Sequence, residues 1–571
     1  MYQPLDSDQK VDVPTLAMQL ASIVGSKGVI TDPDRMRPYC TGYREGAGAA
    51  VAVVRPRTLL QQWEAFKACV AAGCIVITQA ANTGLTGGST PEGEYDRPVV
   101  VMNTMHIKGI FPIRGGQQVV CLPGSTLDEL EGTLAPLGRE PHSVLGSSCL
   151  GASVVGGICN NSGGALLSRG PAYTEYAVYA CVGPNRSVRF HNHLGIELGE
   201  TPEEILSRLA SGNFGDSDVH DNSQKASADD YETIVRSVDA STPARHNNDP
   251  ARLYEVSGSA GRTMVFAVRV DSFQSAGDAA TFYIGTNDPA CLSSVRRHIL
   301  TNAEFLPTSA EYIHKDAFDS AAVYGKDIFC LIRRLGTARL PALFALKSRV
   351  DRLSKKLPLV PAHLADRLLQ FAYRFTPGHL PKRMLQYRQK YDHHLIVKAS
   401  GPAIQETRRL LGDILTREAG AMFECTADEA RAAFLHRFAV AGAAVRQQIV
   451  DDRLIEGIVA LDVALARNDP NWFEVLPDEI ERRLIGKFYY GHFFCHVFHQ
   501  DYLVRRGESV DEVKAALLNL MEARGARHPA EHNVGHRYKA DEPLVRHYQS
   551  LDPTNSLNPG LGMTSRKEGW A

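Results

Sequence analysis

Three histidines stand close together in the last quarter of the chain, in the stretch YYGHFFCHVFHQDY. His492, His496 and His499 are spaced i, i+4 and i+7, so on a helix all three would share one face, whereas on a strand they would not. Three imidazoles within eight residues favour a binding or catalytic site over isolated buried histidines.

Two glycine-rich stretches indicate a different chemistry, the close approach of backbone amides to an anion. VLGSSCLGASVVGGICNNSGG holds six glycines at 144–164, and QAANTGLTGGSTP at 79–91 gathers amides and hydroxyl groups in one loop. The first stretch matches neither of the common phosphate motifs, G-x-x-x-x-G-K-[ST] and G-x-G-x-x-G. Glycine turns in a packed sheet are the alternative, but two such loops behind predicted strands favour one long ligand with a diphosphate.

Apolar periodicity predicts the elements that position these loops. Residues 51–79 predict a β-α-β unit that ends at the first loop, and QVVCLPGSTLDELEG predicts a strand followed by a helix capped by Thr126 and Glu129. HHLIVKAS, residues 403–418 and MFECT predict a β-α-β piece of a second α+β domain. The polar, acidic stretch at 191–250 is expected to be a surface excursion without chemistry.

The whole chain has the composition of a soluble globular protein. Its 571 residues suggest two to four domains, and a net charge of -2 singles out no partner. The eleven cysteines occur singly, which is typical of a reducing compartment. We find no secretory signal and no run of 18 apolar residues, so we expect no membrane-spanning segment.

The order of the motifs resembles a known family. VVRP, NTGLTGGS, PGSTL and GASVVGGICNNSGG follow one another as in the FAD-binding domain of the vanillyl-alcohol-oxidase type. Over nearly the whole chain, PHSVLGSSC, AFLHRFA, YYGHFFCHVFHQDY, PAEHNVGH and DPTNSLNPG are similar to the bacterial quinone-dependent D-lactate dehydrogenases.

The resemblance implies an α+β fold with three parts. An FAD-binding domain of two α/β subdomains is expected at 1–270, completed by 523–571, where DPTNSLNPG would close it. A substrate cap domain would occupy 271–522, with a helical, basic membrane-binding insertion at 314–390.

The resemblance also implies where FAD lies. The diphosphate is expected on the first loop and further contacts elsewhere, at Ala80, Ala81, Asn82, Thr83, Gly84, Gly88, Ser89, Gly146, Ser153, Gly163 and Val265. Val265 could equally be an ordinary core strand residue. The first loop holds no histidine, and Cys149 and Cys159 are more typical of small buried residues than of flavin linkers, so we expect non-covalent FAD.

Related D-2-hydroxy-acid dehydrogenases carry H-x6-H followed later by E-H, which His492, His499, Glu531 and His532 match. Two imidazoles and a carboxylate suit a divalent metal such as zinc or manganese, which could hold the substrate's carboxylate and polarise its hydroxyl group. Those relatives have Gly-Asp-Gly-Asn between the histidines, where this chain has FFCHVF. Without a metal, the histidines would bind the substrate directly.

The same resemblance assigns His532 as the general base that removes the hydroxyl proton. The alternative is that His532 and His536 only pack a terminal loop. Arg437 fits the position at which relatives bring an arginine to the substrate's carboxylate, and Arg446 is a second candidate.

The segment 333–390 concentrates positive charge. It holds 14 Lys or Arg and two acids, a net charge of +12, while the rest of the chain carries -14. Leucines and aromatic residues between the cations suit the surface of an anionic bilayer better than nucleic acid, and a solvated helical face is the third alternative.

The resemblance thus implies a respiratory flavoenzyme that oxidises D-lactate to pyruvate and reduces a membrane quinone. We expect it at the cytoplasmic face of the bacterial inner membrane, without nucleic acid as a partner. The alternatives are a dehydrogenase of another D-2-hydroxy acid, such as D-2-hydroxyglutarate, and a non-catalytic protein that binds lipid or nucleic acid.

Overall fold

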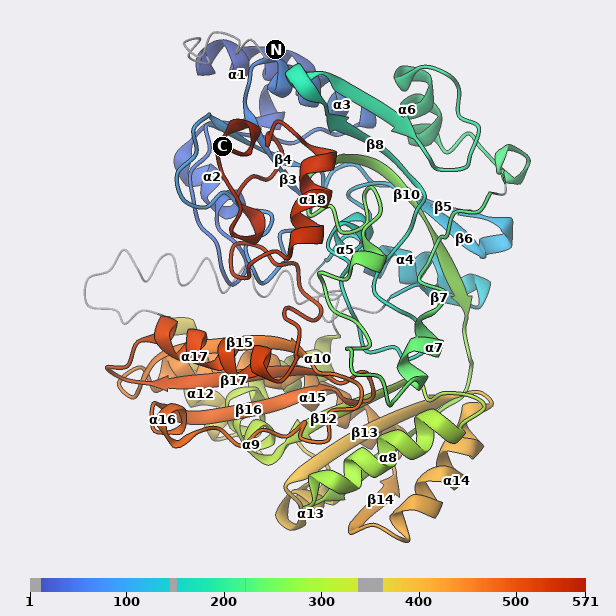
Figure 1. Cartoon of the computed structure of the whole chain (residues 1–571), viewed down its shortest axis with the longest axis vertical. Helices are drawn as coiled ribbons and strands as arrows, with labels where there is room; N and C mark the ends of the chain where they lie inside the picture. Colours follow the sequence, from blue (N-terminus) through green and yellow to red (C-terminus); the bar gives the residue numbers. More distant parts are fainter. Residues whose placement is uncertain (1–11, 144–150, 221, 337–362) are drawn as a thin grey trace.

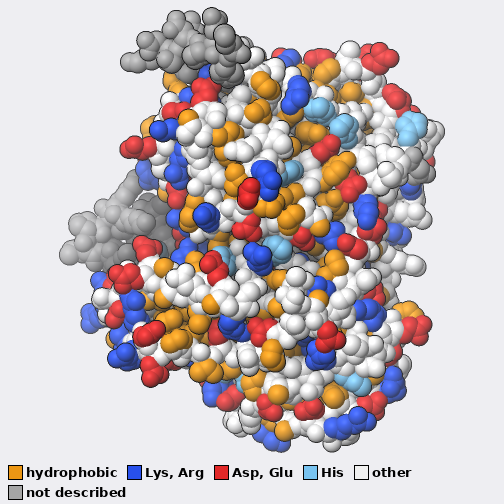
Figure 2. Space-filling model, in the orientation of Figure 1, with side chains coloured by type: hydrophobic (Ala, Val, Ile, Leu, Met, Phe, Trp, Pro, Cys, Tyr) orange, Lys and Arg blue, Asp and Glu red, His pale blue; other side chains and the backbone are white. Residues whose placement is uncertain are grey.

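The computed structural model describes residues 12–143, 151–220, 222–336 and 363–571. Two halves lie one above the other along the long axis (Figure 1). The upper half carries two sheets and the lower half a third, larger one. Lys and Arg are interspersed with Asp and Glu over the face drawn in Figure 2.

The first sheet has the strand order β1-β2-β4-β3, in which β2, β4 and β3 run parallel. Its strands are β1 (Val29–Ile30), β2 (Ala52–Val54), β3 (Ile75–Gln79) and β4 (Val99–Asn103). The helix α3 (Leu59–Ala71) joins β2 to β3 and buries its apolar face, which confirms the predicted β-α-β unit. The loop 80–89 therefore opens at the carboxyl edge of parallel strands.

The second sheet is antiparallel, with the order β5-β6-β10-β8-β9 and β7 paired to β10. Its strands are β5 (Ile110–Ile113), β6 (Gln118–Cys121), β7 (Arg139–Pro141), β8 (Ala177–Val182), β9 (Val188–Asn192) and β10 (Met264–Gln274). The helices α4 (Leu127–Leu134) and α5 (Val154–Cys159) share an apolar core with β6, β8 and β10. Thr126 and Glu129 form the predicted capping box of α4.

The prediction of a surface excursion at 191–250 is wrong. Within it, α6 (Pro202–Ser211) buries three apolar side chains in the core of the upper half, and α7 (Tyr231–Arg236) buries Tyr231 and Val235 in the core of the lower half. The polar average composition of the stretch concealed these apolar residues, because helices of 10 and 6 residues need few apolar positions to cover a core.

The third sheet, in the lower half, has the order β14-β11-β13-β12-β16-β17-β15 and antiparallel pairing between neighbours. Its strands are β11 (Ala279–Thr286), β12 (Ser309–His314), β13 (His393–Ser400), β14 (Gly420–Glu424), β15 (Ile455–Ala464), β16 (Leu484–His492) and β17 (Val497–Arg505). With α14 (Ala403–Leu415) between β13 and β14, the predicted strand-helix-strand piece is confirmed. The sheet positions most of the candidate site residues.

Helices cover both faces of this sheet. On one face lie α8 (Pro289–Asn302), α14 and α17 (Val510–Ala523), and on the other α9 (Lys315–Tyr324) and α15 (Ala427–Val450). Successive residues of a strand enter different cores, as Tyr312 and Ile313 do. The alternation decides which side chains can meet under α15.

The C-terminal segment returns to the upper half. After α18 (Glu542–Leu551), Leu557 pairs in parallel with Val76 of β3, and the Thr78 N–H donates to Oδ1 of Asn558 at 2.7 Å. In Figure 1 this red segment lies beside the blue strands β3 and β4. DPTNSLNPG thus packs against the strand that leads into the first glycine-rich loop.

In the described part of the chain, the basic segment forms three short helices. They are α10 (Lys326–Leu335), α12 (Leu364–Arg374) and α13 (Lys382–Lys390), whereas 337–362 lies outside the described residues. Leu335, Leu368, Phe371 and Phe375 are exposed on or beside these helices, and Phe371 exposes 64% of its surface. None of the described helices is both long and apolar enough to cross a membrane.

Candidate active site

Four adjacent strands of the third sheet place polar side chains in one row. Glu311 of β12 lies opposite His492 of β16 in register, and His499 of β17 lies opposite Asp462 of β15. Side chains two positions apart on a strand point to the same face of the sheet. Ile313 and Tyr490, two positions from Glu311 and His492, belong to the core under α15, so the polar row lies on the face that α15 covers. Strand register therefore brings together groups that are up to 188 residues apart.

A hairpin, not a helix, carries the three histidines. His492 ends β16, a short turn follows at Phe493–Cys495, and His496 adopts a left-handed conformation with φ 52° before β17 begins. His492 and His499 converge across the hairpin, while Nδ1 of His496 lies 2.9 Å from the Ala466 carbonyl oxygen, away from the row. The i, i+7 pair meets because its members lie on adjacent strands.

Glu531 completes the cluster from the C-terminal segment. Its Oε2 lies 3.2 Å from Nε2 of His492 and 3.6 Å from Nε2 of His499. Among the described residues, these three form the one group of histidine, cysteine and acidic side chains whose ligand atoms all lie within 4.8 Å of one another. Two imidazoles and a carboxylate are groups that can ligate a divalent cation.

Both histidines of the cluster turn their other ring nitrogen to a carboxylate. Nδ1 of His492 lies 2.6 Å from Glu311, and Nδ1 of His499 lies 3.4 Å from Asp462. A carboxylate on Nδ1 fixes the orientation of each ring, so that Nε2 points toward Glu531. Burial lowers the pKa of His492, but Glu311 and Glu531 outweigh burial and raise it to about 10.

His532 is held by Asp462. Nδ1 of His532 donates to Oδ2 of Asp462 at 2.7 Å, and the backbone N–H groups of Glu531 and His532 donate to the same oxygen at 2.7 and 3.0 Å. Burial lowers the pKa of His532, but Asp462 outweighs it and raises the pKa above 6.5. His536 instead lies under the first loop, with Nε2 3.3 Å from the Thr90 carbonyl oxygen.

Of the two candidate arginines, only Arg437 reaches the row. Its Nε lies 2.9 Å from Oε2 of Glu311, and its guanidinium covers the ring of Tyr490. Arg446 is instead buried in ion pairs with Asp327 of α10 and Asp366 of α12. Nine residues further along α15, Arg446 therefore binds the basic helices and not the cluster.

Sequence reasoning missed four side chains around the cluster. They are Glu311, Asp462, Arg245, which binds Oε1 of Glu531, and Arg44, whose Nη2 lies 3.6 Å from Asp501. Arg44 and Arg245 both lie outside the third sheet. No local motif marks these residues, since each acquires its partner only when distant segments pack together.

Hydrogen bonds within the first glycine-rich loop and to a neighbouring strand fix its conformation. The Asn103 side chain donates to the Ala80 carbonyl oxygen at 2.9 Å, and the Ser89 hydroxyl donates to Oδ1 of Asn82 at 2.8 Å. Asn82 has φ 55° and Gly87 φ 74°, backbone conformations that turn amide groups toward one side. Among the described residues, the N–H groups from Ala81 to Gly84 donate no hydrogen bond.

The second glycine-rich stretch is described from Gly151 onward, so that Gly146 and Cys149 lie outside the described residues. Ser153 caps α5 by accepting from the Gly156 N–H at 3.0 Å, and Cys159 is buried in the core. Gly163 lies against the Glu531 side chain. The Val265 side chain packs in the apolar core that β10 shares with α4 and α5.

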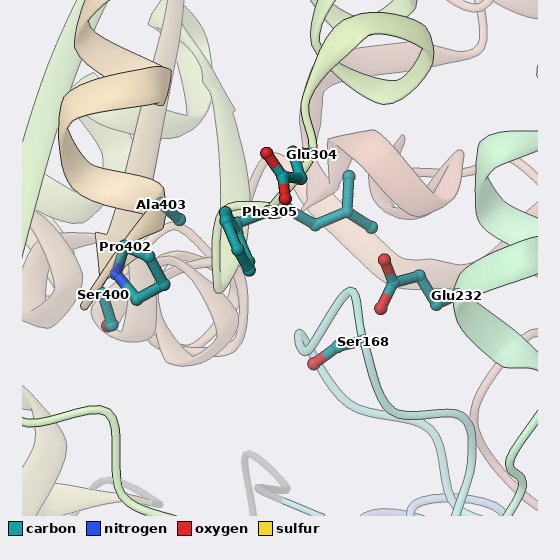
Figure 3. Close-up of a pocket in the computed structure, with 8 residues that line it drawn as sticks. Ser168, Glu232, Glu304, Phe305, Ser400, Pro402 and Ala403 are labelled. Atoms are coloured by element: carbon teal, nitrogen blue, oxygen red, sulfur yellow. The ribbon is translucent and has the colours of Figure 1, made fainter.

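A separate surface pocket lies away from these groups (Figure 3). It is lined by Ser168, Glu232, Glu304, Phe305, Leu306, Ser400, Pro402 and Ala403. None of its residues belongs to the cluster or to either glycine-rich loop. The pocket therefore adds nothing to the chemistry of the row.

Solved structures share the fold at low sequence identity. A p-cresol methylhydroxylase with substrate bound has a TM-score of 0.56 at 13% identity, covering 96% of both chains. A 4-ethylphenol oxidase from Gulosibacter chungangensis has a TM-score of 0.57 at 12% identity, covering 97% of this chain and 98% of its own. The fold is of the vanillyl-alcohol-oxidase type, which confirms the expected α+β class.

Sequence relatives are far more similar. Quinone-dependent D-lactate dehydrogenases from Haemophilus influenzae and Escherichia coli are 56% and 51% identical to this chain. The alignments cover 98% and 97% of this chain, and 100% and 97% of theirs. The family model described as D-lactate dehydrogenase, membrane binding, matches residues 281–570. On this similarity the chain belongs to the family of quinone-dependent D-lactate dehydrogenases.

Proposed function

We propose that this protein oxidises D-lactate to pyruvate, with FAD as the hydride acceptor and a membrane quinone as the final electron acceptor. The observation that carries the proposal is identity of about half of all residues, over nearly full length, to relatives of that name. Their shared name favours D-lactate over D-2-hydroxyglutarate and over a non-catalytic role. The arrangement around His532 supplies the chemistry that such an oxidation needs.

The residues of the first loop fit the diphosphate of FAD. The N–H groups from Ala81 to Gly84 lie at the carboxyl edge of parallel strands and, among the described residues, donate no hydrogen bond, and a Cβ on Gly84 would meet no atom within 4 Å. Ala80, Thr83, Gly88 and Ser89 would complete this cradle. Bound flavin supplies a ring that accepts hydride from the substrate carbon.

FAD is expected to be non-covalent, because the loop offers no histidine and Cys159 is buried in an apolar core. Protein denatured in acid should therefore release all of its yellow colour. Flavin that stays on the polypeptide would contradict this expectation.

His532 would act as the general base. Its Nδ1–H is engaged by Asp462, so Nε2 is the atom available to take the hydroxyl proton of D-lactate. Asp462 then stabilises the imidazolium that forms. The hydroxyl proton would thus be held on His532 while hydride leaves the carbon that carries the hydroxyl group.

A divalent cation such as zinc or manganese fits between His492, His499 and Glu531. Their Nε2 and Oε2 atoms face one another, and each histidine has its second nitrogen at a carboxylate. Such an ion would hold the hydroxyl and carboxylate oxygens of D-lactate and make the hydroxyl more acidic. Chelators should then slow flavin reduction.

Arg437 would bind the substrate's carboxylate. Its ion pair with Glu311 engages Nε, and among the described residues its two Nη groups donate no hydrogen bond. A guanidinium fork suits a carboxylate. Arg437 would thereby orient D-lactate between the cation site and His532.

The basic helices would bind anionic phospholipid at the cytoplasmic face of the bacterial inner membrane, with the protein peripheral to it. Phe371, Phe375 and Leu368 are exposed beside cations such as Arg333 and Arg334. Sedimentation with anionic vesicles should be reversed by high salt. Removal of 333–390 should abolish vesicle binding and quinone reduction but keep FAD and dye reduction.

Anaerobic mixing of the protein with D- and L-lactate and with other hydroxy acids tests the proposal. D-lactate should bleach the flavin fastest, because the similar sequences carry the name of D-lactate dehydrogenases. Faster bleaching by D-2-hydroxyglutarate would change the assigned substrate. A purified protein without any flavin absorption would contradict the proposal altogether.

A further inference from the structure

The two carboxylate oxygens of Glu531 have different partners. Oε2 faces the two histidines, whereas Oε1 is bound by Nη2 of Arg245, a side chain only 3% exposed. Arg245 lies in the segment between α7 and β10, outside the third sheet. One carboxylate oxygen is thus bound by an arginine from outside the third sheet, and the other faces the cluster.

The guanidinium of Arg245 is itself anchored. Its Nη1 donates to the hydroxyl oxygen of Tyr231 at 3.1 Å, and Tyr231 is buried in the core between α7 and α8. Two nitrogens of one planar guanidinium therefore bind the Tyr231 hydroxyl group and Glu531 at the same time. A lysine carries the same charge but presents it from one atom at the end of a flexible chain.

Gly163 limits the position of Glu531 from another side. Its N–H donates to the Glu531 carbonyl oxygen at 3.3 Å, and a Cβ at this glycine would lie 2.8 Å from Cγ of Glu531. The absence of a side chain leaves the room that the glutamate occupies. Arg245 and Gly163 together confine the carboxylate against the hairpin that carries the histidines.

We infer that Arg245 is a positioning residue: it holds Oε1 of Glu531 so that Oε2 faces a divalent cation between His492 and His499. The inference rests on the cation site proposed above. It assigns Arg245 no contact with the substrate. Its effect passes through Glu531, as an outer partner fixes the orientation of a metal ligand.

A purely structural role for Arg245, as a link between α7 and the C-terminal segment, predicts something different. Loss of such a link would lower stability but would leave the affinity of the folded protein for a cation unchanged. Loss of a positioning residue would weaken cation binding in protein that remains folded. Cation affinity and stability must therefore be measured on the same samples.

The test uses FAD-loaded protein stripped of metal, titrated with Zn²⁺ or Mn²⁺ by calorimetry, with its melting temperature and flavin content recorded. Arg245→Met should bind the cation about 10- to 100-fold more weakly than the parent. Arg245→Lys should fall between the two. Arg252→Met is the matched control, because Arg252 is equally buried in the same segment but pairs with Asp230.

The outcomes separate this inference from the proposed function. If the parent binds a cation and folded Arg245→Met binds it equally well, Arg245 is not a positioning residue. If Arg245→Met does not fold, Arg245→Lys becomes the test. Cation affinity equal to that of the parent in Arg245→Lys would overturn the claim that the guanidinium of Arg245 positions Glu531. If the parent binds neither cation, the cation site itself is wrong and the inference fails with it.

Discussion

The two faces of the third sheet carry opposite chemistries on neighbouring residues. On one face Tyr312 and Phe498 pack with Trp472, whose ring lies 5.0 and 5.5 Å from theirs. On the other face the residues next to them in sequence, Glu311 and His499, belong to the polar row. The same strands thus build an aromatic core and a candidate active site.

This difference shows how register sets the position of charge. A slip of one residue in any of the four strands would exchange the faces and put a charged group among aromatic rings. Burial of Tyr312 and Phe498 on one side therefore holds Glu311 and His499 in place on the other. The following changes test that division, from the largest expected effect to the smallest.

Asp462→Asn should break the polar face most severely. The backbone N–H groups of Glu531 and His532 would still hold the amide oxygen toward Nδ1, but an amide lacks the charge that stabilises protonated His532, so flavin reduction by D-lactate should slow about 10³- to 10⁴-fold. Single-turnover mixing measures the rate, with FAD content as the control. A slowing of less than tenfold would mean that Asp462 does not serve the base.

Trp472→Ala should affect the aromatic face alone. Loss of this nearly fully buried side chain should lower the free energy of unfolding by about 3–5 kcal/mol. Denaturant unfolding measures the loss, and flavin reduction by the folded fraction should stay within a few-fold of the parent. Slow chemistry without lost stability would show that the two faces are not separable in this way.

The pH dependence of flavin reduction should report on the polar face. Neutral His532 accepts the proton, and Asp462 outweighs burial to raise the pKa of His532 above 6.5. The rate should therefore rise with pH through that raised pKa. In Asp462→Asn the residual rise should move to lower pH, because the charge that raised the pKa is gone; an unmoved profile would assign it to another group.

Phe371→Ser should leave both faces untouched. This exposed residue of α12 should change the free energy of unfolding by no more than about 0.5 kcal/mol and should not alter flavin reduction. Affinity for anionic vesicles should fall about tenfold, since one aromatic side chain no longer enters the headgroup layer. Unchanged vesicle affinity would exclude α12 from the membrane contact.

Local patterns in the sequence predicted the first β-α-β unit, both glycine-rich loops and the histidine cluster with His492 and His499, and the family resemblance added Glu531 and His532. They could not predict Glu311 or Asp462, because these become neighbours of the histidines only through the register of β12, β16, β17 and β15. The i, i+7 spacing was compatible with a helix, and only the strand pairing shows a hairpin.

Arg245 illustrates the same limit on the other side of the site. It lies in a polar stretch whose average composition predicted a surface loop. In the structure Arg245 is buried and binds Tyr231 and Glu531. Its partner Glu531 is 286 residues away. Arg446 is the opposite case: the sequence made it a candidate to bind the substrate, but in the structure it forms buried ion pairs with Asp327 and Asp366.

Flavin reduction in His532→Ala tests the central claim most directly, that the polar face performs the oxidation through this histidine. The variant should bind FAD like the parent and be bleached by dithionite, but D-lactate should reduce its flavin at least about 10²-fold more slowly. His496→Ala, on the same hairpin but outside the row, is the control and should keep rapid reduction. Parental rates of reduction by D-lactate in His532→Ala would contradict the account.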